Sequence, residues 1–154
     1  NIMQVAQETF ISSTMWTDRL GFIAANETLK KLKKHKIHKK ISSYGNIIKN
    51  GWIKNAKKHK IDISISGLET ILYLKFNYKN NAEIVTFFTQ EMLKRGYLAN
   101  TTITICDSYN SKIIKNYLIN FRKVFQIIKS HYKQGKEIKL KNPLKHNTFQ
   151  RLTG

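Results

Sequence analysis

With 154 residues, 41% of them hydrophobic and 11% aromatic, the chain has the length of one ordinary domain and enough apolar side chains for a core, which excludes the disordered class. Its 28 lysine and arginine residues against nine acidic residues give a formal net charge of +19. No apolar run reaches the roughly 18 to 20 residues that span a bilayer, and no signal-peptide pattern is present, so we expect a cytoplasmic protein.

The positive charge has two interpretations. A net charge this high is typical of proteins that bind nucleic acid or an anionic membrane. The lysines, however, spread along the whole chain and accompany many isoleucine and asparagine residues. All three amino acids have codons rich in A and T, so we favour the base composition of the gene as the cause. Neither nucleic acid nor a membrane is the expected partner.

The first half of the chain predicts two helices. Apolar residues recur at helical spacing from about Asp18 to Lys40, and Asp18 or Thr17 is a suitable N-cap. Lysines crowd the end of this helix, where they favour the negative end of the helix dipole. A second helix is expected from Ile41 to His59, with apolar side chains every three or four residues.

The second half predicts a small sheet with helices. Three strands are expected, at Asp62–Ser66 (ended by Gly67), Ile71–Tyr78 and Thr101–Cys106. Two helices are expected, at Ala82–Arg95 (closed by Gly96) and from Asn110 to about Ile128. Such closely spaced strands indicate an α+β fold, in which a small, mostly antiparallel sheet has helices packed on one face and is preceded by a long helix.

Few residues are candidates for chemistry. His35 and His38 are three apart on a predicted helix, but the lysines around them repel cations and no acid or thiol is near, so we expect no metal site. Cys106, the only cysteine, excludes an internal disulfide, suits a reducing compartment and is interpreted as a core residue. The Lys30–Lys40 run lacks interleaved aromatic residues for base stacking and is interpreted as a solvated helix face.

One segment is a candidate phosphate site. Ser12, Ser13 and Thr14 lie just before the expected start of the first helix. Hydroxyl groups and free N–H groups at the positive end of a helix suit a phosphate. Such residues also form ordinary capping turns, and the residues alone leave both interpretations open.

Several segments carry a family resemblance. Gln4–Gly21 read QVAQETFISSTMWTDRLG, and Phe88–Ala99 read FTQEMLKRGYLA. Ser66-Gly67 before a predicted strand and the ending from Leu144 to Leu152 add shorter matches in the same order. These segments resemble the patterns TFISSTxWT[ED]R[IL]G, FxQE[ML]LxRG[FY]LA, SG and HxGF[QK]RL of class III aminotransferases, in the branch similar to glutamate-1-semialdehyde 2,1-aminomutase.

This resemblance implies part of a fold-type I enzyme that uses pyridoxal 5'-phosphate to move an amino group between an amino donor and a carbonyl compound. Residues 1–17 would end the large cofactor-binding domain, 18–40 would form a connecting helix, and 41–154 would form the C-terminal small domain. Family members are homodimers with active sites at the subunit interface. Ser13 and Thr14, with Ser12 next, would reach the cofactor phosphate of the other subunit.

The same resemblance places the lysine that forms the Schiff base before Asn1. We therefore expect the chain to be a C-terminal fragment that is inactive alone and contributes no catalytic residue of its own. Departures from the family pattern occur at Asn142–His146 and at Asp107–Asn110, which lacks the histidine and threonine often found there. The substrate, the donor and the choice between aminotransferase and aminomutase stay open. A basic nucleic-acid-binding module and a non-catalytic remnant of the fold are the alternatives.

Overall fold

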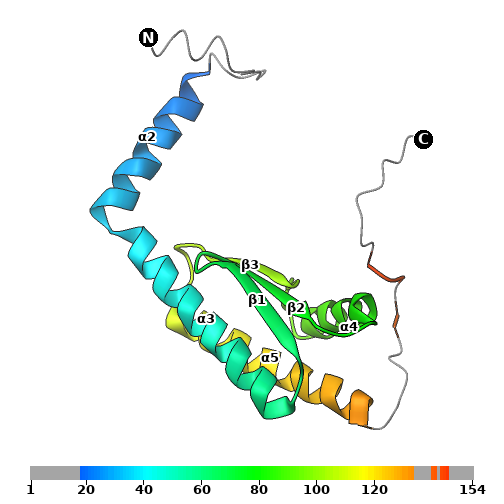
Figure 1. Cartoon of the computed structure of the whole chain (residues 1–154). Coiled ribbons are helices and arrows are strands. Elements are labelled where there is room, and N and C mark those ends of the chain that lie inside the picture. The colour runs from blue at the N-terminus through cyan, green and yellow to red at the C-terminus, as the bar shows by residue number, and fades with distance from the viewer. Residues whose placement is uncertain (1–17, 134–139, 142, 146–154) are drawn as a thin grey trace, which may run out of the picture. The chain divides into compact units, whose positions relative to one another are not determined.

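The computed structural model describes residues 18–133, 140–141 and 143–145. The chain divides into two compact units, Asn1–Ile37 and His38–Gly154, and each is described by itself. The elements in chain order are α2 (Arg19–Lys34), α3 (Ile37–His59), β1 (Ile63–Leu68), β2 (Ile71–Phe76), α4 (Asn81–Leu93), β3 (Thr102–Thr104) and α5 (Ser111–Lys133) (Figure 1). In these described stretches, no helix is long and apolar enough to cross a membrane.

The first unit contains the helix α2. Its N-cap is Asp18, whose Oδ1 accepts a hydrogen bond from the Leu20 N–H at 2.9 Å, as the sequence predicts. Lys31, Lys33 and Lys34 lie in its last turn, where cations favour the helix dipole. No side chain of α2 is buried.

The predicted boundary between the first two helices is wrong by several residues. The helical path is interrupted at His35 and Lys36, where Lys36 has a positive φ of 48°, and α3 begins at Ile37 rather than Ile41. Ile41 and Tyr44, on the α3 side of the break, are partly buried against the core of the second unit. Lysines lie on both sides of the interruption, so charge and periodicity do not reveal it in the sequence.

The sheet is antiparallel and has the order β1-β2-β3. Gly67 does not end the first strand as predicted but pairs with Leu72 inside the β1–β2 hairpin. Its φ is +93°, and a Cβ at this position would lie 2.2 Å from the Ile71 carbonyl oxygen, so glycine is required there. β3 pairs with β2 only from Thr102 to Thr104, less than the predicted length.

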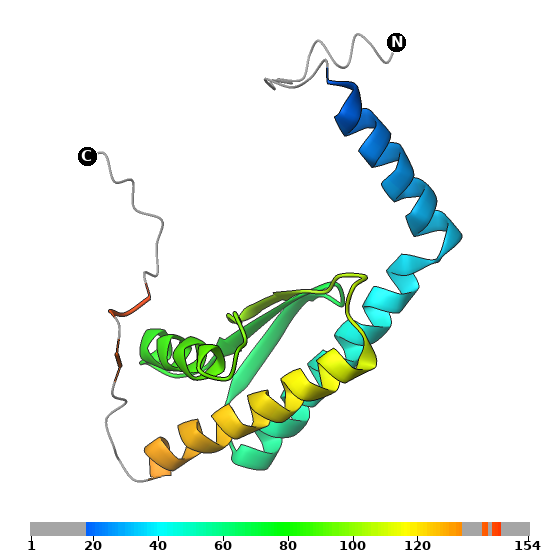
Figure 2. The ribbon, with the colours of Figure 1, turned by 180° about the vertical axis from the view of Figure 1, so that it is seen from behind.

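Helices cover one face of this sheet, as predicted, and the core lies between them and β2 (Figures 1 and 2). Leu72, Leu74 and Phe76 are buried on that face, while Tyr73 and Lys75, between them in the sequence, are exposed. Aromatic rings connect the helices through this core. Trp52 of α3 stacks on Phe121 of α5 at 5.8 Å, and Phe88 of α4 meets Phe121 edge-on at 5.7 Å.

Candidate functional site

The predicted phosphate ligands Ser12, Ser13 and Thr14 lie outside the described residues. The structure describes the helix that follows them. The N-terminal turn of α2 contains no acidic residue and begins with Arg19, next to the capping Asp18. The backbone N–H groups of this helix end and the Arg19 guanidinium attract anions, while the Asp18 carboxylate already caps the Leu20 N–H.

The second segment of the family resemblance, Phe88–Ala99, forms the last turns of α4 and its C-cap. Gly96 has a φ of +81°, and the N–H groups of Gly96 and Tyr97 bond to the carbonyls of Leu93 and Met92 at 2.9 and 3.0 Å. These two hydrogen bonds form the glycine-terminated helix end that the sequence predicts. It turns the chain sharply from α4 toward β3.

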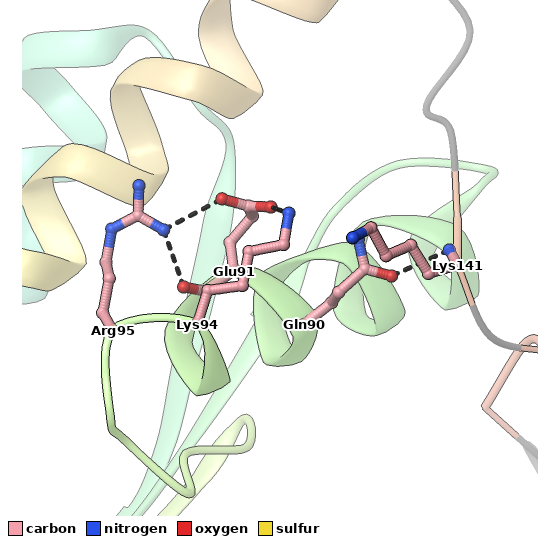
Figure 3. Close-up of polar contacts among 5 residues, drawn as sticks. All are labelled: Gln90, Glu91, Lys94, Arg95 and Lys141. Carbon is pink, nitrogen blue, oxygen red and sulfur yellow. Dashed lines mark hydrogen bonds and ion pairs between the residues drawn. The ribbon is translucent and has the colours of Figure 1, made fainter.

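A buried carboxylate fixes this helix end. Glu91 accepts hydrogen bonds from Lys94 and from Arg95 Nη1, and the same Nη1 also bonds to the Glu91 carbonyl at 2.7 Å (Figure 3). Burial by itself raises the pKa of Glu91, but the hydrogen bonds and charges of Lys94 and Arg95 outweigh it and hold that pKa below its usual value. An ionised carboxylate that is held by two cations cannot readily accept a proton, so Glu91 is a structural anchor and not a general base.

Polar side chains of α4 also hold the C-terminal segment. The Lys141 N–H donates to Gln90 Oε1 at 2.9 Å, and the Lys145 N–H donates to Thr86 Oγ1 at 3.0 Å (Figure 3 shows the first). A cavity of about 480 Å³ lies between α4, the turn after it and this segment. Leu93 and Leu98 form part of its apolar wall, and its polar groups come from Thr86, Thr89, Gln90, Asn100 and Lys145. Among the described residues, its lining contains no acidic side chain.

A second hollow is the groove between α3 and α5, called the α3–α5 groove below. Its volume is about 520 Å³. Its apolar lining comes from Ile47, Ile114, Leu118 and Ile119. Its charged lining comes from Lys54, Lys58, Lys115 and Arg122. The sequence did not reveal this groove, because residues more than 50 positions apart form its two walls.

The other candidate residues form no reactive cluster in the described part of the chain. His35 is the C-cap of α2 and His38 lies in α3, and no group of three or more His, Cys, Asp or Glu side chains in the described ranges could hold a metal ion. The interpretation of Cys106 as a core residue is wrong, because its side chain is exposed and its Sγ lies 3.0 Å from Ser108 Oγ. Ile105 occupies the buried position instead, at 3% exposure.

The segment Asp107–Asn110, where the sequence departs from the family pattern, is tied to α3. Lys40 Nζ donates to the Asp107 carbonyl and to its Oδ1, both at 2.7 Å. The hydrogen bond with Asp107 raises the pKa of Lys40. Lys40 is therefore engaged in a contact and is not a free member of a polyanion-binding lysine run.

Comparisons with known proteins give matches among solved structures alone. No family model matches the chain, and no curated protein matches it. The FumI protein of Sphingopyxis sp. MTA144, solved in its PLP internal aldimine form, matches with a TM-score of 0.72 and 13% identity, covering 85% of this chain and 32% of that one. An omega-transaminase from Sphaerobacter thermophilus matches with a TM-score of 0.57 and 9% identity, covering 63% of this chain and 25% of that one.

A transaminase solved with PLP bound also matches, with a TM-score of 0.54, 13% identity, 64% of this chain and 25% of that one. The chain thus spans about a third or less of the proteins it is similar to. At these identities the likeness concerns the fold and not the chemistry. The three-stranded antiparallel sheet and its helices have the fold of one part of PLP-dependent transaminases.

Proposed function

We propose that this chain is the C-terminal portion of a PLP-dependent aminotransferase or aminomutase of the class III family, which moves an amino group between an amino donor and a carbonyl compound. The observation that supports this most strongly is the fold likeness over 85% of the chain to a PLP-containing protein. The sequence resemblance at Gln4–Gly21 and Phe88–Ala99 also supports it.

The residues present fit the proposed cofactor. Three hydroxyl side chains, Ser12, Ser13 and Thr14, come four or more residues before a helix whose first turn carries Arg19 and no acid. The carboxylate of Asp18, between them and the helix, already accepts a hydrogen bond from the Leu20 N–H at that helix end. Hydroxyl donors at a positive helix end suit a phosphate dianion. We propose that these three residues hold the cofactor phosphate, and that the partner subunit of a homodimer provides the rest of that site. PLP, when bound, supplies an electron sink for the transfer of the amino group.

This proposal assigns binding, and not proton transfer, to the chain. Lys94 and Arg95 balance the negative charge of Glu91. The buried Tyr117 hydroxyl accepts a hydrogen bond from Trp52 Nε1 at 3.1 Å. Burial raises the pKa of Tyr117, so that hydroxyl keeps its proton at neutral pH. The lysine that moves protons in such enzymes is proposed to lie in sequence upstream of Asn1.

The test is cofactor binding by the protein encoded by the whole reading frame. Thr14→Ala should weaken PLP binding by at least about tenfold, because a hydrogen bond to a charged phosphate contributes roughly 1.5–3 kcal/mol. Equilibrium dialysis or titration of the cofactor absorbance measures this. Thr9→Ala, a matched loss of a hydroxyl in the same segment, should leave the affinity within about twofold.

Two results would contradict the proposal. If Thr14→Ala and Thr9→Ala bind PLP equally well, the hydroxyl segment is only a helix cap. If the whole protein retains PLP but transfers no amino group from any of a panel of amino donors to keto acids and aldehydes, it is a non-catalytic remnant of the fold. Analytical ultracentrifugation of the same sample tests the homodimer.

A further inference from the structure

The α3–α5 groove has a continuous apolar floor. On α3, Ile47, Gly51 and Lys58 are spaced so that they lie on one face of the helix, and Ile114, Leu118 and Arg122 do the same on α5. The helices approach closely at the middle of the groove, because a Cβ on Gly51 would lie 2.6 Å from Leu118 Cδ2. From Ile47 to Lys58 the groove follows α3 for about 16 Å, or three helical turns (Figure 2 shows α3 and α5).

The rim of the groove is positively charged on both sides. Lys54 and Lys58 of α3 are four residues apart, and Lys115 and Arg122 of α5 face them across the floor. In the described ranges, ion pairs are made by Lys30, Lys40, Lys94 and Arg95, so none of the four rim cations has a carboxylate partner. The groove therefore presents an apolar strip between two rows of uncompensated positive charge.

The positive charge of the groove also lowers the pKa of the buried His59. It lies at the end of α3 with 5% exposure, and its pKa is lowered by burial and by the charges of Lys129, Lys58 and Arg122. Two of these three cations also line the groove. Their field thus reaches the protein interior, where water does not screen it fully.

We propose that the α3–α5 groove binds an acidic amphipathic helix of a partner protein. A helix laid along the groove would place one apolar stripe on Ile47, Leu118 and Ile119 and carboxylates on both flanks against the rim cations. The length fits, since three turns are the reach of a short docking helix with residues at i, i+3, i+4 and i+7. This inference uses no step of the aminotransferase proposal, but the remainder of the longer protein proposed above is a competing occupant of the groove.

Other occupants fit the groove less well. A second copy of the chain brings another +19 charge and nine scattered acidic residues, so it repels the rim instead of complementing it. Nucleic acid would gain from the cations but not from an aliphatic floor, and no aromatic side chain lines the groove for base stacking. A membrane surface would need a protruding apolar face, whereas in this groove Ile114 is buried, Leu118 and Ile119 are partly buried, and Ile47 alone is exposed.

The experiment uses a dye-labelled peptide of about 15 residues, with leucines at i, i+3, i+4 and i+7 and glutamates on the flanks. Fluorescence anisotropy at low and at physiological salt measures its binding to the full chain. A peptide of the same composition, scrambled so that the leucine stripe is lost, controls for charge alone. The striped peptide should bind at least about tenfold more tightly than the scrambled peptide.

Two matched pairs of protein variants locate the site. Lys54→Glu with Lys115→Glu reverses one cation on each rim and should weaken binding about tenfold or more. Lys39→Glu with Lys123→Glu changes the net charge equally on the same two helices, away from the groove, and should change it less than about threefold. Ile47→Ser in the floor, against Ile113→Ser outside it, tests the apolar part, since both side chains are similarly exposed at 48% and 42%.

Several outcomes would overturn the proposal. These are equal binding of the striped and scrambled peptides, equal loss in the two charge-reversal pairs, and absence of saturable binding at low salt. Displacement of the peptide by duplex DNA or by phosphatidylserine vesicles, with the same dependence on Lys54 and Lys115, would assign the groove to that ligand instead. Circular dichroism checks the fold of each variant, and Lys58→Glu with Arg122→Glu replaces a rim pair that does not fold.

Discussion

At the scale of single residues, Glu91 illustrates how a family-like motif can have a structural role. Its carboxylate is 9% exposed and contacts Lys94, the C-cap of α4, and Arg95 just beyond it. The spacing of three and four residues is visible in the sequence, and it predicts contact between these side chains on one helix face. The burial of Glu91, which makes this contact important for stability, cannot be seen in the sequence.

Glu91→Gln should destabilise the fold by about 1–3 kcal/mol at neutral pH, because two charge-assisted hydrogen bonds are lost at a buried position. The pKa of Glu91 is lowered on folding, so its stabilisation is present above the ordinary value of 4.5 and is lost as the pH falls through the lower folded value. Urea unfolding at neutral and at acid pH should therefore show the difference shrinking in acid.

Glu83→Gln on the same helix is the matched control. Glu83 accepts a hydrogen bond from the Asn80 amide at 3.2 Å and belongs to no described ion pair, so its substitution should cost less at neutral pH. If Glu91→Gln cost the same at neutral pH and in acid, shape rather than charge would explain the role of Glu91.

His59 makes the stability of the fold sensitive to pH. Its Nε2 is buried and has no hydrogen-bond partner, and burial with the charges of Lys129, Lys58 and Arg122 lowers its pKa from 6.5. Below pH 6.5 the unfolded chain therefore binds a proton at this residue more readily than the folded chain does, and stability falls as the pH falls.

His59→Phe should remove most of this slope between about pH 8 and 5, measured by urea unfolding. His38→Gln, at an exposed position of the same helix, should leave the slope unchanged. A slope in His59→Phe equal to that of the unmodified chain would assign the pH dependence to other groups.

At the scale of elements, two glycines show where packing, and not helix propensity, requires glycine. Gly45 of α3 is buried, and a Cβ there would lie 1.6 Å from the Glu69 carbonyl oxygen in the β1–β2 turn. Gly21 of α2 would meet nothing within 4 Å. Gly45 lies inside α3 and Gly21 in the first turn of α2, and alanine is the better helix former at both.

Gly45→Ala should destabilise the fold by about 3 kcal/mol or more, because the hairpin turn and α3 must separate. Gly21→Ala should instead stabilise α2, because alanine is favoured over glycine in a helix by about 0.5–1 kcal/mol, and the helix content should rise. Thermal unfolding and far-UV circular dichroism measure the two effects. Equal and small effects at both positions would mean that α3 does not approach the turn at Gly45.

Periodic elements could be predicted from the sequence, and their ends only in part. The strands and helices of the second unit have regular apolar spacing, and Gly96 marked a helix end correctly. The interruption at His35 and Lys36 was missed, because neither residue is a glycine or proline and lysines lie on both sides of it. Gly67 was misplaced for a related reason, since it serves a close approach inside a hairpin.

At the scale of the whole molecule, the α+β layer with helices on one face followed from the order of the elements. The candidate sites could be predicted from the sequence less well than the fold. The phosphate ligands Ser12, Ser13 and Thr14 lie outside the described residues and stay a prediction. The α3–α5 groove could not be predicted, because it requires Gly51 and Leu118, distant in sequence, to meet.

The position of β1 at the edge of the described sheet has a consequence for how copies of the chain meet one another. An edge strand exposes unpaired backbone N–H and C=O groups, with which a strand of another molecule can pair. The alternating residues Ile63, Ser64 and Ile65 of β1 suit such pairing. A shallow hollow beside it is lined by Lys49, Lys57 and Lys60. These ammonium groups make the approach of a second, equally basic edge unfavourable, so the lysine content protects the chain against aggregation, and dissolved salt weakens that protection.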